Sequence, residues 1–122
     1  MSAQRPILVV DDDASIRQTV REILDLAGYP VETAADGVEA LKSVEQREPS
    51  LVLLDMRMPQ LDGWGFARAA RERGLALRIV VMTAAENARR WAEEIGADGY
   101  VAKPFELDEL LRAVERVRRV EG

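Results

Sequence analysis

The amino-acid sequence predicts an α/β fold in which five parallel strands alternate with five helices. Short apolar runs recur along the chain, and each is followed by a stretch with apolar residues three and four positions apart. Gly or Pro stands at the end of most of these segments, as is typical of the ends of helices and strands. The run Leu51–Leu54 is apolar throughout, which is typical of a parallel strand buried on both faces. Right-handed crossovers then place helices on both faces of the sheet.

The first two predicted strands flank a helix with one apolar side. Ile7–Val10 is the first strand, and Val31–Ala34 alternates apolar and polar residues, as a short edge strand does. The helix between them is expected to end near Gly28. Its apolar residues share one face: Ile16, Val20, Ile23, Leu24 and Ala27.

The second helix starts at Asp36-Gly37 and ends before Pro49. Three of its residues are predicted to face the core: Val38, Leu41 and Val44. The third strand, Leu51–Leu54, then runs directly into Asp55.

A turn signal, Asp62-Gly63, precedes the third helix. This helix is expected from about Trp64 to Arg73, where Gly74 ends it. The fourth strand, Ile79–Met82, ends at Thr83.

The fourth helix is polar and is predicted from about Glu86 to Ile95. Within it, Trp91 is interpreted as the main core anchor. The fifth strand, Tyr100–Ala102, runs into Lys103-Pro104. The last helix has one apolar stripe: Leu107, Leu110, Leu111, Val114 and Val117.

Composition limits the function. A length of 122 residues suits one domain, residues 1–122, with no output domain. The net charge of -5 argues against nucleic acid as a direct partner. Without Cys or His, the chain has no disulfide, thiolate metal site or imidazole chemistry. No run is long and apolar enough for a membrane span, and the N-terminus lacks a secretory signal, so a soluble, cytoplasmic domain is expected.

Reactive residues stand at the carboxyl ends of four predicted strands. These are the pair Asp11 and Asp12, then Asp55, Thr83 and Lys103. Because parallel strands end at one edge of the sheet, their side chains should converge. Carboxylate oxygens suit a hard cation, Mg²⁺ or else Mn²⁺. A cation beside a carboxylate and a lysine suits phosphoryl transfer, with Asp55 as the attacking group.

Over almost its full length the chain resembles the receiver domain of two-component response regulators. The matching motifs are Val9–Asp13, Leu54–Pro59 with Asp62-Gly63, Met82–Ala84, Gly96–Tyr100 and Lys103–Phe105. The resemblance implies the flavodoxin-like (CheY-like) doubly wound fold with strand order 2-1-3-4-5, which periodicity leaves open. The segment from Thr83 to Gly96 is about half a helical turn shorter than is usual in this family.

The resemblance also implies roles for the metal and acceptor residues. Asp55 would be the phosphorylation site. Asp11, Asp12 and Asp55 would hold Mg²⁺, together with the backbone carbonyl of Arg57. Lys103 would pair with the phosphoryl group.

The remaining implied roles concern the switch. The Thr83 hydroxyl and the Ala84 backbone N–H would bind phosphoryl oxygens. Tyr100 would turn inward as Thr83 moves, although a half-buried strand aromatic is an equal alternative. The surface that changes would be formed by the fourth and fifth strands and helices.

The implied partners are a sensor histidine kinase or phosphotransfer protein and a downstream protein of unknown identity. A phosphorylation-dependent homodimer is left open. The domain would be a signalling switch that catalyses its own phosphorylation and dephosphorylation, and no enzyme in the ordinary sense.

Two other classes remain as alternatives. A phosphatase of the haloacid-dehalogenase type also uses an Asp nucleophile after a buried strand, but its general acid, two residues on, is Arg57 here. An interaction module that no longer uses phosphorylation is the other alternative, and the acid pair, Thr83 and Lys103 argue against it.

Overall fold

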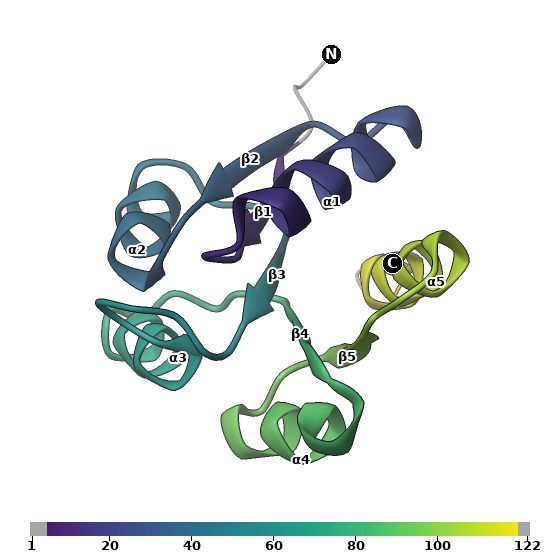
Figure 1. The fold of residues 1–122 in the computed structure, drawn as a ribbon. Coiled ribbons are helices and arrows are strands. Elements are labelled where there is room, and N and C mark those ends of the chain that lie inside the picture. Colours follow the sequence, from purple (N-terminus) through teal and green to yellow (C-terminus); the bar gives the residue numbers. More distant parts are fainter. Residues whose placement is uncertain (1–4, 120–122) are drawn as a thin grey trace.

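The computed structural model describes residues 5–119 and confirms the predicted alternation of strands and helices (Figure 1). The first four and last three residues of the predicted 1–122 domain lie outside the described residues. In chain order the elements are β1 (Ile7–Val10), α1 (Ala14–Leu26), β2 (Val31–Ala34), α2 (Gly37–Gln46), β3 (Leu51–Asp55), α3 (Gly63–Glu72), β4 (Ile79–Ala84), α4 (Ala85–Ile95), β5 (Gly99–Lys103) and α5 (Leu107–Arg119).

All strand pairs are parallel, and the sheet has the order β2-β1-β3-β4-β5. This is the flavodoxin-like order that the family resemblance implied, and it places β2 at an edge as predicted. β3 lies at the centre, and all five of its residues are buried. The continuous apolar run that ends at Asp55 is therefore explained by a strand covered on both faces.

Two separate apolar cores cover the two faces of the sheet. Along β3, Leu51 and Leu53 point into the core under α1 and α5. The alternate residues Val52 and Leu54 point into the core under α2, α3 and α4. Figure 1 shows α1 and α5 on one side of the sheet and the other three helices on the opposite side.

Aspartate side chains begin three of the helices. Asp13 caps α1, because its Oδ1 accepts hydrogen bonds from the backbone N–H groups of Ser15 and Ile16 at 2.8 and 3.1 Å. Asp36 and Asp62 cap α2 and α3 in the same way. These caps stabilise the first turn of each helix, and each helix then packs back on the sheet.

Helix α4 differs because it has no side-chain cap and no preceding loop. β4 ends at Ala84 and α4 begins at Ala85, so the segment noted as short in the sequence lacks a connecting loop. Its prediction as a core-anchored helix holds, because Trp91 is buried. Gly96 ends the helix with φ 65°, as predicted for its C-terminal stop.

One residue predicted to face the core, Val38, is exposed, and so are two residues of the predicted apolar stripes, Leu107 and Ala27. Val38 is 42% exposed, because α2 buries the adjacent Gly37 against the loop before α3 and Val38 then points about 100° away around the helix. Leu107 is 49% exposed at the first residue of α5, where the stripe that reaches the sheet begins only at Leu110. Ala27 is exposed because α1 ends at Leu26, and Ala27 is its C-cap.

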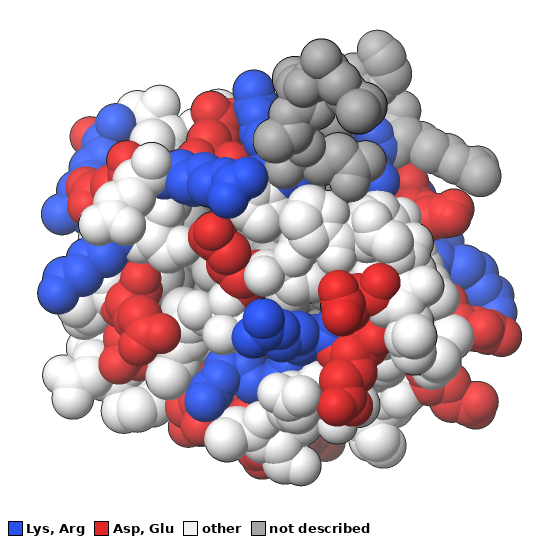
Figure 2. Space-filling model, turned by 90° about the horizontal axis from the view of Figure 1, so that it is seen from above, with Lys and Arg blue, Asp and Glu red and all other residues white. Residues whose placement is uncertain are grey.

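The described helices include none that is both long and apolar enough to cross a membrane. On the face seen in Figure 2, acidic and basic side chains are interspersed, and neither sign forms a continuous area. This face is not the basic surface that phosphate backbones require.

Candidate functional site

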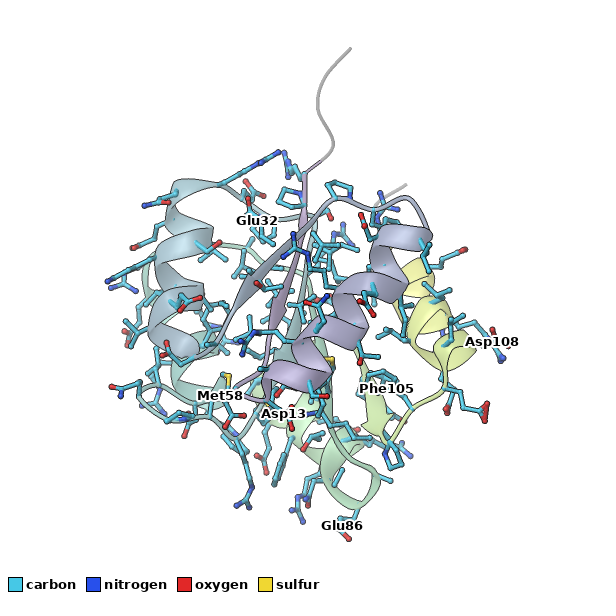
Figure 3. All side chains as sticks on the ribbon, turned by 45° about the horizontal axis from the view of Figure 1, so that its top comes forward. Asp13, Glu32, Met58, Glu86, Phe105 and Asp108 are labelled. Atoms are coloured by element: carbon cyan, nitrogen blue, oxygen red, sulfur yellow. The ribbon has the colours of Figure 1, made fainter. Side chains whose placement is uncertain are left out.

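The carboxyl ends of four strands meet at one edge of the sheet, as predicted. The register pairs Val10 with Leu54 and Asp55 with Met82, so the residues that follow β1 lie beside the end of β3. It also pairs Ala84 with Lys103, which brings the ends of β4 and β5 together. Three residues labelled in Figure 3 lie near this end of the molecule. Asp13 precedes α1, Met58 lies in the loop between β3 and α3, and Glu86 lies at the start of α4.

Lys103 connects two buried carboxylates at this edge. Its Nζ donates to Asp11 Oδ2 at 2.7 Å and lies 3.5 Å from Asp55 Oδ1. The other Asp11 oxygen, Oδ1, accepts the backbone N–H of Asp13 at 2.9 Å. Asp11 is thus held from two sides, while Asp55 keeps a looser ion pair and stays open to another partner.

Three carboxylates form a cluster suited to a cation. Asp11, Asp12 and Asp55 each offer one oxygen, and these oxygens lie within 4.8 Å of one another. Asp12 is exposed, so the cluster is open to solvent on one side. An all-oxygen set with an open side fits Mg²⁺, which accepts few protein ligands and keeps several waters.

Electrostatics show that this cluster holds excess negative charge. The pKa of Asp55 is raised from 3.8 to about 7, chiefly by burial and next by the charge of Asp11. Lys103 lowers the pKa of Asp55 but does not offset the other effects, and Asp12 raises it by a hydrogen bond and by its charge. A bound cation would relieve this repulsion, so the charge of the cluster is compatible with a divalent cation.

We expect Mg²⁺ binding to weaken about tenfold when the pH falls from about 8 to about 6. The reason is that Asp55, with its pKa raised to about 7, binds a proton in this range and must release it to bind the cation. Isothermal titration calorimetry at both pH values measures the change. An affinity that is equal at both pH values would contradict a metal ligand at Asp55 with a pKa of about 7.

The predicted switch residues lie on adjacent strands. Thr83 is buried and makes no side-chain hydrogen bond with the part of the chain that the structure describes. Ala84, at the end of β4, is exposed. Tyr100 is 47% exposed on β5, so its ring points outward in this structure. The Lys103-Pro104 peptide bond is cis.

The side chain of Arg57 makes a contact that the sequence did not predict. Its guanidinium lies 5.1 Å from the ring centroid of Trp91 on α4, within the range of a cation–π contact. Trp91 in turn packs edge-to-face against Trp64 of α3. These residues are far apart in the sequence, and no local pattern indicates that they meet.

Arg17 is a second residue that the sequence analysis missed. Its Nη1 donates to the backbone carbonyl of Asp11 at 2.8 Å, which fixes the turn that carries the acid pair. The position of Arg17 could have indicated this contact, because it is a basic residue one turn from the start of the first predicted helix.

An apolar groove of about 370 Å³ opens beside the acidic cluster. It lies between α1 and the start of α5, and Phe105 stands between these helices in Figure 3. Lys103 belongs to both the groove and the cluster. The other residues that line it are Ser15, Ile16, Thr19, Val20, Pro104 and Phe105.

The chain is similar to proteins of a known family. The family model described as "Response regulator receiver domain" matches residues 7–115. Response regulator MprA from Mycobacterium sp. (strain KMS) and its counterpart from Mycobacterium leprae (strain TN) are each 44% identical over 115 residues. Each match covers 93% of this chain but 50% of the relative, so the chain spans about half the length of these relatives.

Solved structures agree with this match. Chemotaxis protein CheY4 of Vibrio cholerae superposes with a TM-score of 0.84 at 36% identity, covering 94% of this chain and 99% of that one. A putative response regulator from Chloroflexus aurantiacus J-10-fl gives a TM-score of 0.89 at 33% identity, covering 96% and 99%.

Proposed function

The chain belongs to the response regulator receiver domain family, and on that premise we propose that it takes a phosphoryl group from a histidine kinase or phosphotransfer protein onto Asp55. The observation that carries this proposal is the convergence of Asp11, Asp12, Asp55 and Lys103 at one edge of the sheet. The site contains a buried carboxylate, Asp55, whose ion pair with Lys103 is loose at 3.5 Å, and the Lys103 ammonium can meet the incoming charge.

In the proposed reaction an oxygen of Asp55 bonds to phosphorus as the bond from phosphorus to the donor imidazole nitrogen breaks. The electron pair of the broken bond stays on that nitrogen. Lys103 pairs with a phosphoryl oxygen, and the Thr83 hydroxyl and the Ala84 backbone N–H donate to the others. When bound, Mg²⁺ supplies charge neutralisation for the phosphoryl oxygens.

Asp11 and Asp12 would hold the metal together with Asp55 and the backbone carbonyl of Arg57. The buried position of Asp11 and the exposed position of Asp12 support direct contact by Asp12 and a more distant role for Asp11. The chemistry of three carboxylates with a backbone carbonyl suits Mg²⁺ or Mn²⁺.

Phosphorylation adds about -1.5 to -2 charges and three acceptors at Asp55. Thr83, which is buried beside the site, gains a partner and moves toward it. Tyr100 on the neighbouring strand then turns inward from its exposed position. The surface formed by β4, α4, β5 and α5 thereby changes, and a downstream protein or a second copy of the chain reads that change.

The groove between α1 and α5 is proposed to hold the phosphodonor protein. Lys103 lines both the groove and the acidic cluster, so a partner seated there has its phosphohistidine within reach of Asp55. Ile16, Val20 and Phe105 make much of the lining of this groove apolar. This suits a packed helix face of a partner protein, and not a nucleic acid. A kinase partner of this kind implies that the exchange takes place in the cytoplasm.

We expect incubation with acetyl phosphate and Mg²⁺ to add one phosphoryl group to the domain. Intact-protein mass spectrometry measures the gain, and chelation of the metal should prevent it, because the acceptor cluster would keep its excess negative charge. Asp55→Asn should not gain mass, since its amide is a poor nucleophile.

The matched control is Asp108→Asn, which changes an exposed carboxylate on α5 and should be phosphorylated like the parent. Equal mass gain in Asp55→Asn and the parent would exclude Asp55 as the acceptor. No gain in the parent under any condition would favour an interaction module that works without phosphorylation. Turnover of a generic phosphate ester would indicate a phosphatase.

A further inference from the structure

We propose that Trp91 is a positioning residue for the metal site, and that it acts through Arg57. The proposal rests on the proposed function, in which the backbone carbonyl of Arg57 is a metal ligand. What it adds is a physical connection from that carbonyl to α4, through side chains that lie on three different parts of the chain.

Arg57 lies two residues after Asp55, in the loop between β3 and α3. Its side chain is exposed, yet its guanidinium lies 5.1 Å from the centroid of the Trp91 ring. A side chain held in one rotamer restricts the backbone angles of its own residue. Fixing the guanidinium therefore also limits where the Arg57 carbonyl can point.

The Trp91 ring that Arg57 contacts is itself held by its neighbours. Trp91 is buried, and its ring packs edge-to-face on Trp64, with centroids 4.9 Å apart and an interplanar angle of 67°. Trp64 Nε1 donates to Glu94 Oε1 of α4 at 2.9 Å. The two indoles thus join α3 to α4, and Arg57 rests on a ring that cannot easily turn.

Helix α4, which carries Trp91, follows β4 directly. No loop separates this helix from β4, so a displacement of Thr83 or Ala84 passes directly into its first turn. A displacement of α4 carries Trp91 with it and changes the support of Arg57. Because coupling between two sites is reciprocal, Mg²⁺ binding and the position of α4 should influence each other.

The test measures Mg²⁺ affinity by isothermal titration calorimetry, which does not depend on tryptophan fluorescence. We expect Arg57→Ala and Trp91→Leu each to weaken Mg²⁺ binding about two- to fivefold, the range of one exposed cation–π contact. Trp91→Phe keeps an aromatic face and should stay within about twofold of the parent.

The double variant separates positioning from general damage to the core. If Trp91 acts through Arg57, then Trp91→Leu has no further effect on Mg²⁺ affinity once Arg57 is alanine. A purely structural role would instead weaken binding equally in both backgrounds. Should Trp91→Leu fail to fold, Trp91→Met takes its place in the cycle, because it also removes the aromatic face. Arg57→Ala changes an exposed side chain, so the parent and this variant can be compared in either case.

The outcomes distinguish this inference from the function on which it rests. A parent that binds Mg²⁺ and is phosphorylated, with unchanged affinity in Arg57→Ala, overturns the role of Trp91 and leaves the proposed function intact. Additive losses in the double variant also overturn it. A parent that binds no Mg²⁺ overturns both.

Discussion

Replacing Asp55 with asparagine is expected to raise the free energy of unfolding by up to about 4 kcal/mol above pH 7 in the absence of divalent cations. Asp55 is 6% exposed, and its pKa is raised from 3.8 to about 7 by burial and by the charge of Asp11. The ionised carboxylate is therefore unfavourable in the folded state. Asparagine has nearly the same shape and carries no charge, so it removes this cost.

The effect depends on pH in a defined direction. In the unfolded chain Asp55 loses its proton near pH 3.8, whereas in the folded protein it keeps the proton until about pH 7. Between these values the folded state binds more protons, so the stability of the parent falls as the pH rises through this window. The advantage of Asp55→Asn should be almost absent near pH 4 and complete near pH 8.

Urea denaturation of both proteins at several pH values measures this difference. Asp108→Asn serves again as the control, because this exposed carboxylate in the first turn of α5 should change the free energy of unfolding by less than about 1 kcal/mol. Saturating Mg²⁺ should reduce the advantage of Asp55→Asn, since the cation stabilises the ionised parent. A stability difference that does not change with pH would contradict the raised pKa of Asp55.

Gly37→Ala is expected to destabilise the fold by about 2–4 kcal/mol. The backbone N–H of Gly37 donates to the carbonyl oxygen of Leu61 at 3.0 Å. A Cβ at Gly37 would collide with that oxygen and lie 2.7 Å from Leu61 Cβ and 2.8 Å from its carbonyl carbon. These are backbone or backbone-linked atoms, so the loop between β3 and α3 would have to move.

Gly65→Ala provides the comparison for this variant. Its added Cβ would lie 2.5 Å from Leu61 Cδ1, which is the end of a flexible side chain that can rotate away. Alanine is also favoured over glycine within a helix, so the net change should stay within about 1 kcal/mol. Chemical denaturation of both variants checks the contrast. A similar loss in both would mean that the Leu61 backbone yields as readily as its side chain.

Much of this fold could be predicted from local sequence patterns. The continuous apolar run of β3 and the three- and four-residue spacing of apolar residues in α1 and α5 indicate which faces of these elements are buried, because residues close in the sequence share a face. The same reasoning failed at Val38 and Leu107, where the packing partner decides which side of a helix is buried and where its buried stripe begins. The aspartates at helix starts were readable because a cap acts within three residues.

The position of the candidate site could also be predicted from the strand ends. Parallel strands with right-handed crossovers end at one edge of the sheet whatever their order, so the sequence predicts that four residues converge there: Asp11, Asp12, Asp55 and Lys103. That rule needs only the alternation of strands and helices, and the residue types then indicate oxygen ligands and a cation. The order of the strands came from family resemblance, since periodicity carries no information on which strands are neighbours.

The alternation of elements, the parallel sheet and the shared edge of reactive residues can thus be worked out from the chain alone, because each depends on local spacing. The stacking of Arg57 on Trp91, the hydrogen bond from Arg17 to Asp11 and the raised pKa of Asp55 cannot. These depend on distances between segments remote in the chain and on the loss of water around a charge, and both quantities exist only once the helices have packed on the sheet.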